Sequence, residues 1–95
     1  MERPQSIEID LASVTTPEEL QVVLAEALSF PGWYGHNWNA FWDAITGLVE
    51  MPRILHLQGF SELAAKLPGD ALLLKGRLED MKQMYPDHAP NVFHE

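Results

Sequence analysis

Three short segments of the chain have the composition of β-strands, and long stretches with helical patterns separate each from the next. The expected strands are residues 7–10, 53–58 and 91–93. Strands that are joined by helices rather than by tight turns run parallel, and such crossovers are right-handed almost without exception. The order β-α-α-β-α-α-β therefore predicts an α/β fold, in which a small three-stranded parallel β-sheet packs against about four helices.

The expected helices have local start signals in the sequence. They cover residues 17–28, 37–47, 59–67 and 70–85. Thr16 is a good N-cap for the first helix, Pro17 suits its first position, and Glu19 completes a capping box. Asn37 can cap the second helix, and Asp70 can cap the fourth.

The second helix lies within the most unusual stretch of the chain, residues 31–50, PGWYGHNWNAFWDAITGLVE. Its apolar residues recur at the i, i+3, i+4 and i+7 spacing of a helix that packs on a core: Trp38, Phe41, Trp42, Ile45 and Val49. A polar row follows about 120° round the same helix. It consists of Asn39, Asp43, Thr46 and Glu50. This row is either an ordinary solvated face or a surface that receives a partner.

The chain carries a formal net charge of −8, and its first half is almost free of cations. No lysine or arginine occurs between Arg3 and Arg53. The acidity argues against direct binding to nucleic acid or to an anionic membrane, because both need a cationic face. It favours a surface that attracts a basic partner.

Length and composition restrict the remaining classes of protein. At 95 residues the chain is expected to form a single domain over residues 1–95. It contains no cysteine, which excludes disulfides and zinc ribbons, and no apolar run long enough to span a bilayer. Its N-terminus lacks the hydrophobic region of a secretion signal, so a cytoplasmic location is the default expectation.

An enzyme of this sequence would have to rely on His36 and Asp43, with His56 as a further acid–base or metal-binding group. Motifs of zinc proteases, serine hydrolases and phosphate-binding loops do not occur. We therefore expect no catalytic residue, no cofactor and no metal site. A small hydrolase that uses His36 and Asp43 stays as the alternative from a different functional class.

A long and specific string of residues runs through the central stretch. It consists of Pro31, Trp33, Tyr34, Gly35, Asn37, Ala40, Trp42, Asp43, Thr46, Gly47, Val49, Glu50 and Pro52. In this string the chain resembles the barstar family of intracellular ribonuclease inhibitors, and elsewhere the likeness is one of element order, length and acidity. The resemblance implies the barstar-like fold and an inhibitor that blocks a cationic active site with a carboxylate, which stands where the substrate phosphate would lie.

The resemblance also implies which residues bind the partner. It assigns the inhibitory carboxylate to Asp43, and it places Glu79 on the last helix near a second acidic contact. Further positions in the same surface are Trp33, His36, Asn37, Asn39, Trp42, Thr46 and Gly47. The expected partner is a basic extracellular-type ribonuclease or a nuclease toxin, bound one-to-one, against which the chain acts as an immunity protein or antitoxin. The alternative is a barstar-fold interaction module with a non-nuclease partner.

The chain departs from the family pattern at three positions of this surface. Asn39 stands where barstar has an aspartate, His36 where it has a glutamate, and Leu48 where it has a tryptophan. The loss of two acids implies a target other than barnase, and His36 suggests pH-dependent binding because histidine titrates near neutrality. A structural role and a partner contact both stay open for Asn37, Trp42 and Gly47.

Overall fold

A computed structural model describes residues 3–95, and its elements follow the expected order. They are β1 (Ser6–Asp10), α1 (Pro17–Ala27), α2 (Trp38–Asp43), a π-helical turn η1 (Ala44–Leu48), β2 (Ile54–Gln58), α3 (Phe60–Lys66), α4 (Pro68–Met84) and β3 (Asn91–His94). The predicted α/β class and the order of strands and helices are confirmed. No helix in this part of the chain combines the length and the apolar character that crossing a membrane requires.

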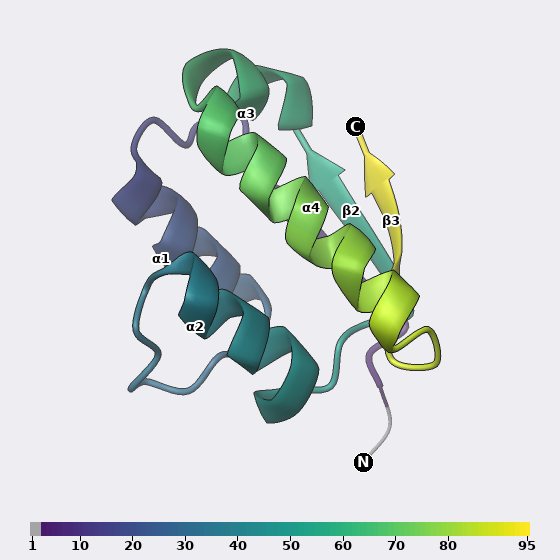
Figure 1. The fold of residues 1–95 in the computed structure, drawn as a ribbon. Helices are drawn as coiled ribbons and strands as arrows, with labels where there is room; N and C mark the ends of the chain where they lie inside the picture. The colour runs from purple at the N-terminus through teal and green to yellow at the C-terminus, as the bar shows by residue number, and fades with distance from the viewer. Residues whose placement is uncertain (1–2) are drawn as a thin grey trace.

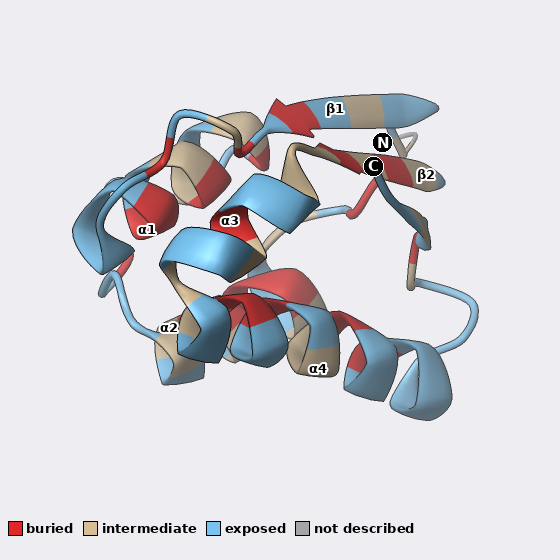
Figure 2. Ribbon diagram, turned by 90° about the horizontal axis from the view of Figure 1, so that it is seen from above, coloured by how far each residue is buried: buried red, intermediate tan, exposed pale blue. Residues whose placement is uncertain are grey.

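The three strands found within residues 3–95 form one parallel sheet in the order β1-β2-β3. Ile9 of β1 and Leu55 and Leu57 of β2 are almost fully buried. Figure 2 shows β1 and β2 on one side of the molecule and α2 and α4 on the other, with buried residues between them. The core therefore lies between one face of the sheet and the helices, among which α4 runs beside α2 (Figure 1).

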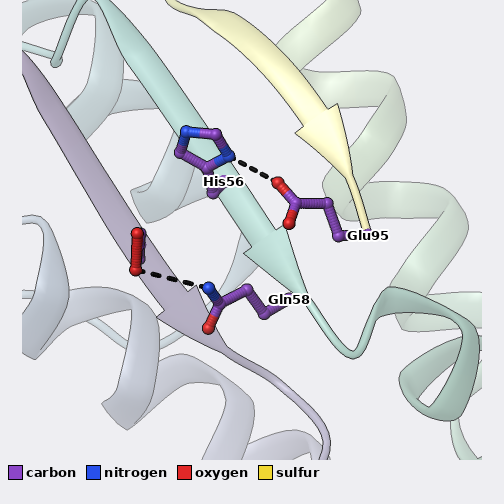
Figure 3. Close-up of polar contacts among 4 residues, drawn as sticks. His56, Gln58 and Glu95 are labelled. Atoms are coloured by element: carbon purple, nitrogen blue, oxygen red, sulfur yellow. Dashed lines mark hydrogen bonds and ion pairs between the residues drawn. The ribbon is translucent and has the colours of Figure 1, made fainter.

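The opposite face of the sheet carries polar side chains that point away from the helices (Figure 3). His56 Nδ1 lies 2.5 Å from Glu95 Oε1, and Gln58 Nε2 donates a hydrogen bond of 3.3 Å to Glu8 Oε2. The Phe93 ring stacks on the His56 ring and is half-exposed. This polar face lies on the side of the molecule opposite α2 and α4.

Both capping signals that open the first two helices are confirmed. The Thr16 hydroxyl accepts a hydrogen bond of 3.1 Å from the Glu19 backbone N–H. The Glu19 carboxylate in turn accepts hydrogen bonds from the hydroxyls of Thr15 and Thr16, and the bond from Thr15 is the main reason that the pKa of Glu19 is lowered. Asn37 Oδ1 accepts a bond of 2.8 Å from the Ala40 backbone N–H, so Asn37 does cap the second helix.

The expected cap at Asp70 is wrong. The last helix begins earlier, at Pro68, which suits a first helical position because proline has no N–H to leave unsatisfied there. Asp70 therefore lies inside the first turn of α4, where its carboxylate accepts a hydrogen bond of 3.0 Å from Trp38 Nε1. This bond ties the start of α2 to the start of α4.

One glycine is required where β2 leads into α3. Gly59 has a φ of +73°, which side chains of L-residues rarely adopt. A Cβ at this position would lie 2.6 Å from the backbone nitrogen of Ala12. The close approach of these two segments therefore depends on the missing side chain.

Arg3 fastens the chain ahead of β1 to two later loops. Its Nε donates to the Met51 carbonyl at 2.9 Å, and Nη1 donates to the Asp87 carbonyl at 2.9 Å. Nη2 contacts further carbonyl oxygens at 3.0–3.3 Å, those of Pro52, His88 and Ala89. The arginine thus joins the loop before β2 to the loop before β3.

Candidate functional site

As far as Asp43, the second helix has the exposed polar face that its sequence predicts, and its apolar face is turned to the core. Its inward residues are buried in the core or packed against it: Trp38, Phe41, Trp42, Ala44 and Ile45. Asn39 and Asp43 are exposed on the other side. Trp42 is only half-buried, so one side of it packs against the core and another side is open to solvent.

The helix changes character directly after Asp43. The expected single helix to Gly47 is present in extent, but α2 ends at Asp43 and residues 44–48 form the π-helical turn η1. Its wider spacing is closed by a hydrogen bond of 3.2 Å from the Val49 N–H to the Ala44 carbonyl, five residues apart. The Thr46 hydroxyl donates to the Trp42 carbonyl at 2.7 Å. Such single π-helical turns occur frequently at functional sites.

A pocket of about 560 Å³ opens between the exposed sides of α2 and α4. It is lined by Asn39, Trp42 and Asp43 from α2 and by Arg77, Asp80, Gln83 and Met84 from α4. The pocket therefore combines two carboxylates and one guanidinium with side-chain amides and apolar surface.

Asp43 holds its carboxylate free at the wall of this pocket. The residue is exposed, and its side chain takes part in no hydrogen bond or ion pair with any other residue in the range 3–95. The Asn37 cap and the bond from Trp38 to Asp70 fix the helix that carries it. The carboxylate is thus positioned by a packed helix and is available to cations from outside.

The loop that leads into α2 is anchored by Tyr34. The Tyr34 hydroxyl donates to Gln21 Oε1 at 2.5 Å and lies 3.2 Å from the Asn37 carbonyl. Burial raises the pKa of Tyr34 to about 12, so this hydroxyl stays protonated at any physiological pH. The anchor leaves Trp33 on the outside of the loop, where it is 73% exposed.

His36 is held in an unusual backbone conformation at the end of this loop. Its φ is +51°, in the left-handed region that few non-glycine residues adopt. Its side chain is exposed, with one edge against the Tyr34 ring at a centroid distance of 5.3 Å. His36 and Asn37 line a separate pocket of about 310 Å³ beside α1.

Thr46 and Gly47 do not reach the Asp43 pocket. They line a third pocket of about 170 Å³, together with Glu50, Met81 and His88. Gly47 has no positive φ, and a Cβ built on it meets nothing within 4 Å, so backbone geometry does not require a glycine there. The structure removes the geometric explanation for Gly47 and leaves the partner contact as a hypothesis.

The structure does not bring Glu79 to Asp43. Glu79 lines a pocket on another side of α4, which also contains Lys75 and His94, whereas the next residue, Asp80, lines the Asp43 pocket. The sequence does not predict the α4 wall of the pocket. The signal was present, because Arg77, Asp80 and Met84 recur at helical spacing, but only the packing of α4 on α2 shows which face is turned to the site.

The residues of the hydrolase alternative are separated in space. Asp43 and His36 line different pockets, and His56 is paired with Glu95 on the far face of the sheet (Figure 3). Among residues 3–95 no three His, Asp or Glu side chains are grouped so that they could hold a metal ion. Asp43 and His36 therefore do not form an acid–base pair in this structure.

Comparison with known proteins finds a matching family model and a similar protein. A family model described as "Barstar (barnase inhibitor)" matches residues 5–94, a range that includes both walls of the Asp43 pocket. A protein of Bacillus subtilis (strain 168), named "Putative ribonuclease inhibitor YrdF", is 39% identical over 56 residues. That alignment covers 59% of this chain and 62% of the relative, so it spans less than two thirds of the relative's length.

Proposed function

This chain belongs to the barstar family, and from that premise we propose that it inhibits a ribonuclease or a ribonuclease-like toxin by filling the enzyme's cationic active site. The observation that carries the proposal is the free carboxylate of Asp43, which stands on a packed helix at the wall of an open pocket. An acidic chain with such a group is suited to a basic protein rather than to nucleic acid.

The chemistry of an enzyme that cleaves RNA explains why a carboxylate is suited to this task. Such an active site gathers cationic side chains around a phosphodiester. A carboxylate accepts charge-assisted hydrogen bonds from the same groups, and arginine can hold it with two parallel bonds. Asp43 already lacks partners of its own within residues 3–95, so it gives up no internal bond when it binds. The carboxylate therefore takes the place of the phosphate.

Exposed apolar side chains lie in the Asp43 pocket and in the segments before and after α2. Trp33 is 73% exposed, Met84 is 61% exposed, and Leu48, at the end of η1, is 45% exposed. Aromatic and apolar residues of this kind exclude water around a charged contact, which strengthens it. We include these three residues and the open side of Trp42 in the binding surface.

A second carboxylate from α4 belongs to the same surface. Asp80 lines the Asp43 pocket, and Glu79 does not. We therefore assign the second acidic contact to Asp80. Two carboxylates on neighbouring helices suit an active site that holds more than one cation.

The net charge of −8 supports rapid capture of a basic partner. Opposed fields speed association at low salt, and barnase with barstar is itself a reference case for this steering. We propose a one-to-one complex, formed in the cytoplasm where cellular RNA needs protection, in which the chain acts as an immunity protein or antitoxin.

An inhibition assay with matched charge variants tests the proposal. Purified chain is titrated into barnase and into basic ribonucleases from the producing cells, and cleavage of a fluorogenic RNA is followed. Asp43→Ala is compared with Glu62→Ala, which removes the same charge from the exposed side of α3, outside the Asp43 pocket. We expect Asp43→Ala to weaken inhibition by more than about 2 kcal/mol, the range of interface hot spots, for which barstar is again a reference case.

Two results would contradict the proposal. Equal inhibition by the Asp43→Ala and Glu62→Ala variants would show that the effect of the carboxylate is one of net charge only. A basic protein that binds the wild-type chain without any slowing of RNA cleavage would favour the interaction module with a non-nuclease partner.

A further inference from the structure

The Asp43 pocket contains a cation that a plain phosphate mimic would not need. Arg77 of α4 is half-buried in the wall that faces α2. Asp43 and Asp80 line the same pocket, and Asn39 and Gln83 add side-chain amides. Within residues 3–95 these are the charged and amide groups that share the pocket with the guanidinium.

Arg77 does not neutralise either of these carboxylates. No Asp or Glu oxygen in residues 3–95 lies within 4.0 Å of its guanidinium, and the guanidinium donates no hydrogen bond in the same range. All five N–H donors of an arginine are therefore left to solvent or to a partner. A complex that closes over the pocket would remove the solvent and leave this charge unsatisfied unless the partner supplies an acceptor.

The cationic side chains of a ribonuclease cleft cannot supply that acceptor. The cations that attract Asp43 and Asp80 would repel a guanidinium that lies between the same two helices, and like charges that face each other across an interface disfavour the complex. The charge pattern of the pocket is negative on α2 and of both signs on α4, and a partner surface of mixed sign matches it best.

We propose that Arg77 selects a ribonuclease that carries a carboxylate at the rim of its cationic cleft, opposite α4. This inference rests on the proposed inhibitor function and specifies its target further. The guanidinium would hold the carboxylate with two parallel hydrogen bonds, a geometry that lysine cannot reproduce. Leu73, one turn before Arg77, and Met84, at the end of the helix, are exposed apolar residues that would exclude water from this contact.

Lys75 offers a control on the same helix. It is a cation two positions before Arg77, but it lines the pocket that contains Glu79 and His94 on another side of α4. Removing either positive charge changes the net charge of the chain equally. A difference between the two variants therefore reports a local contact rather than the field of the whole molecule.

The test uses the full chain and whichever ribonuclease the wild-type chain inhibits, beginning with barnase and continuing with the basic ribonucleases of the producing cells. Inhibition constants are measured for Arg77→Gln, Arg77→Glu, Lys75→Gln and Lys75→Glu, with thermal unfolding to verify that each variant is folded. Arg77→Gln keeps most of the side-chain stem. We expect it to weaken inhibition about tenfold or more, Arg77→Glu to weaken it further, and the Lys75 variants to match the wild type or to inhibit slightly better.

A charge swap then identifies the acceptor. Each carboxylate at the rim of the ribonuclease cleft is changed to lysine, and one of these changes should restore inhibition by Arg77→Glu. Tighter or unchanged inhibition by Arg77→Gln, or no restoration by any swap, would overturn the inference while leaving the inhibitor function intact. A wild-type chain that inhibits no ribonuclease would instead overturn the proposed function, and this inference with it.

Discussion

Replacing Gly47 by alanine should raise stability and weaken binding at the same time. Gly47 lies in η1 with an ordinary backbone conformation, and a Cβ at this position meets nothing within 4 Å. Glycine inside a helix is less stable than alanine by about 0.5–1 kcal/mol, and η1 is a terminal turn, so the gain should be near the lower end, about 0.5 kcal/mol. For a chain of this size that gain raises Tm by about 2–4 °C.

The effect on inhibition should have the opposite sign. If a partner packs closely against the exposed backbone at Gly47, the added methyl group overfills the interface, and overpacking typically costs about 1–3 kcal/mol. The inhibition constant should then rise about 5- to 150-fold. A variant that binds weakly because its fold is damaged would also have a lower Tm. A higher Tm together with weaker inhibition therefore points to the contact at Gly47.

The assay needs both measurements on the same samples. Gly76→Ala is the control, because a Cβ at Gly76 also meets nothing within 4 Å and the residue does not line the Asp43 pocket. We expect that variant to gain stability and to inhibit like the wild type. A lower Tm for Gly47→Ala would refute our interpretation of the backbone, and a higher Tm with unchanged inhibition would refute close approach by a partner.

Three further predictions concern the scaffold and are checked by chemical denaturation. Gly59→Ala should lower the free energy of unfolding by at least about 1–2 kcal/mol, because the left-handed backbone disfavours a side chain and the added Cβ meets neighbouring backbone. Arg3→Ala should lower it by about 1–3 kcal/mol through loss of the carbonyl contacts that join two loops, an amount reduced because some of these carbonyls regain water. Burial, and secondarily Lys75, lower the pKa of His94 from its ordinary value of 6.5, so the unfolded chain binds this proton more readily. The contribution of His94 to stability should therefore be fully present above about pH 6.5 and be lost as the pH falls below it, and His94→Gln should remove this part of the pH dependence.

Most of the fold could be predicted because its signals are local. The Thr16 capping box and the Asn37 cap depend on side chains that bond to backbone within the same turn, and the structure contains both. Asp70 is also a residue type that favours the N-cap position, but it does not cap its helix. Its carboxylate accepts a bond from Trp38 on another helix, and no sequence pattern indicates that long-range partner. A local signal fails where tertiary structure offers the group a different bond.

The candidate site was predictable on one wall and not on the other. Residues of α2 follow one another along a single strongly periodic helix, so the sequence places Asn39 and Asp43 on one face, and the structure has them there. The α4 wall depends on how a second helix is rotated against the first. Adjacent positions differ by about 100° of rotation, so an error of one residue replaces Asp80 by Glu79 and moves the carboxylate to a different pocket.

The π-helical turn explains why the predicted polar row does not form one surface. In a regular helix Thr46 would follow Asp43 on the same face. Beyond Asp43 the hydrogen bonding changes to a spacing of five residues, which rotates everything that follows. Thr46 turns its hydroxyl back to the Trp42 carbonyl and lines a separate pocket, and the exposed apolar residue after this turn is Leu48. Asp43 is thus the last polar residue before the break, so a partner that contacts both Asp43 and Gly47 must cross η1. Alanine at Gly47 should then weaken binding even though it leaves the Asp43 pocket unchanged.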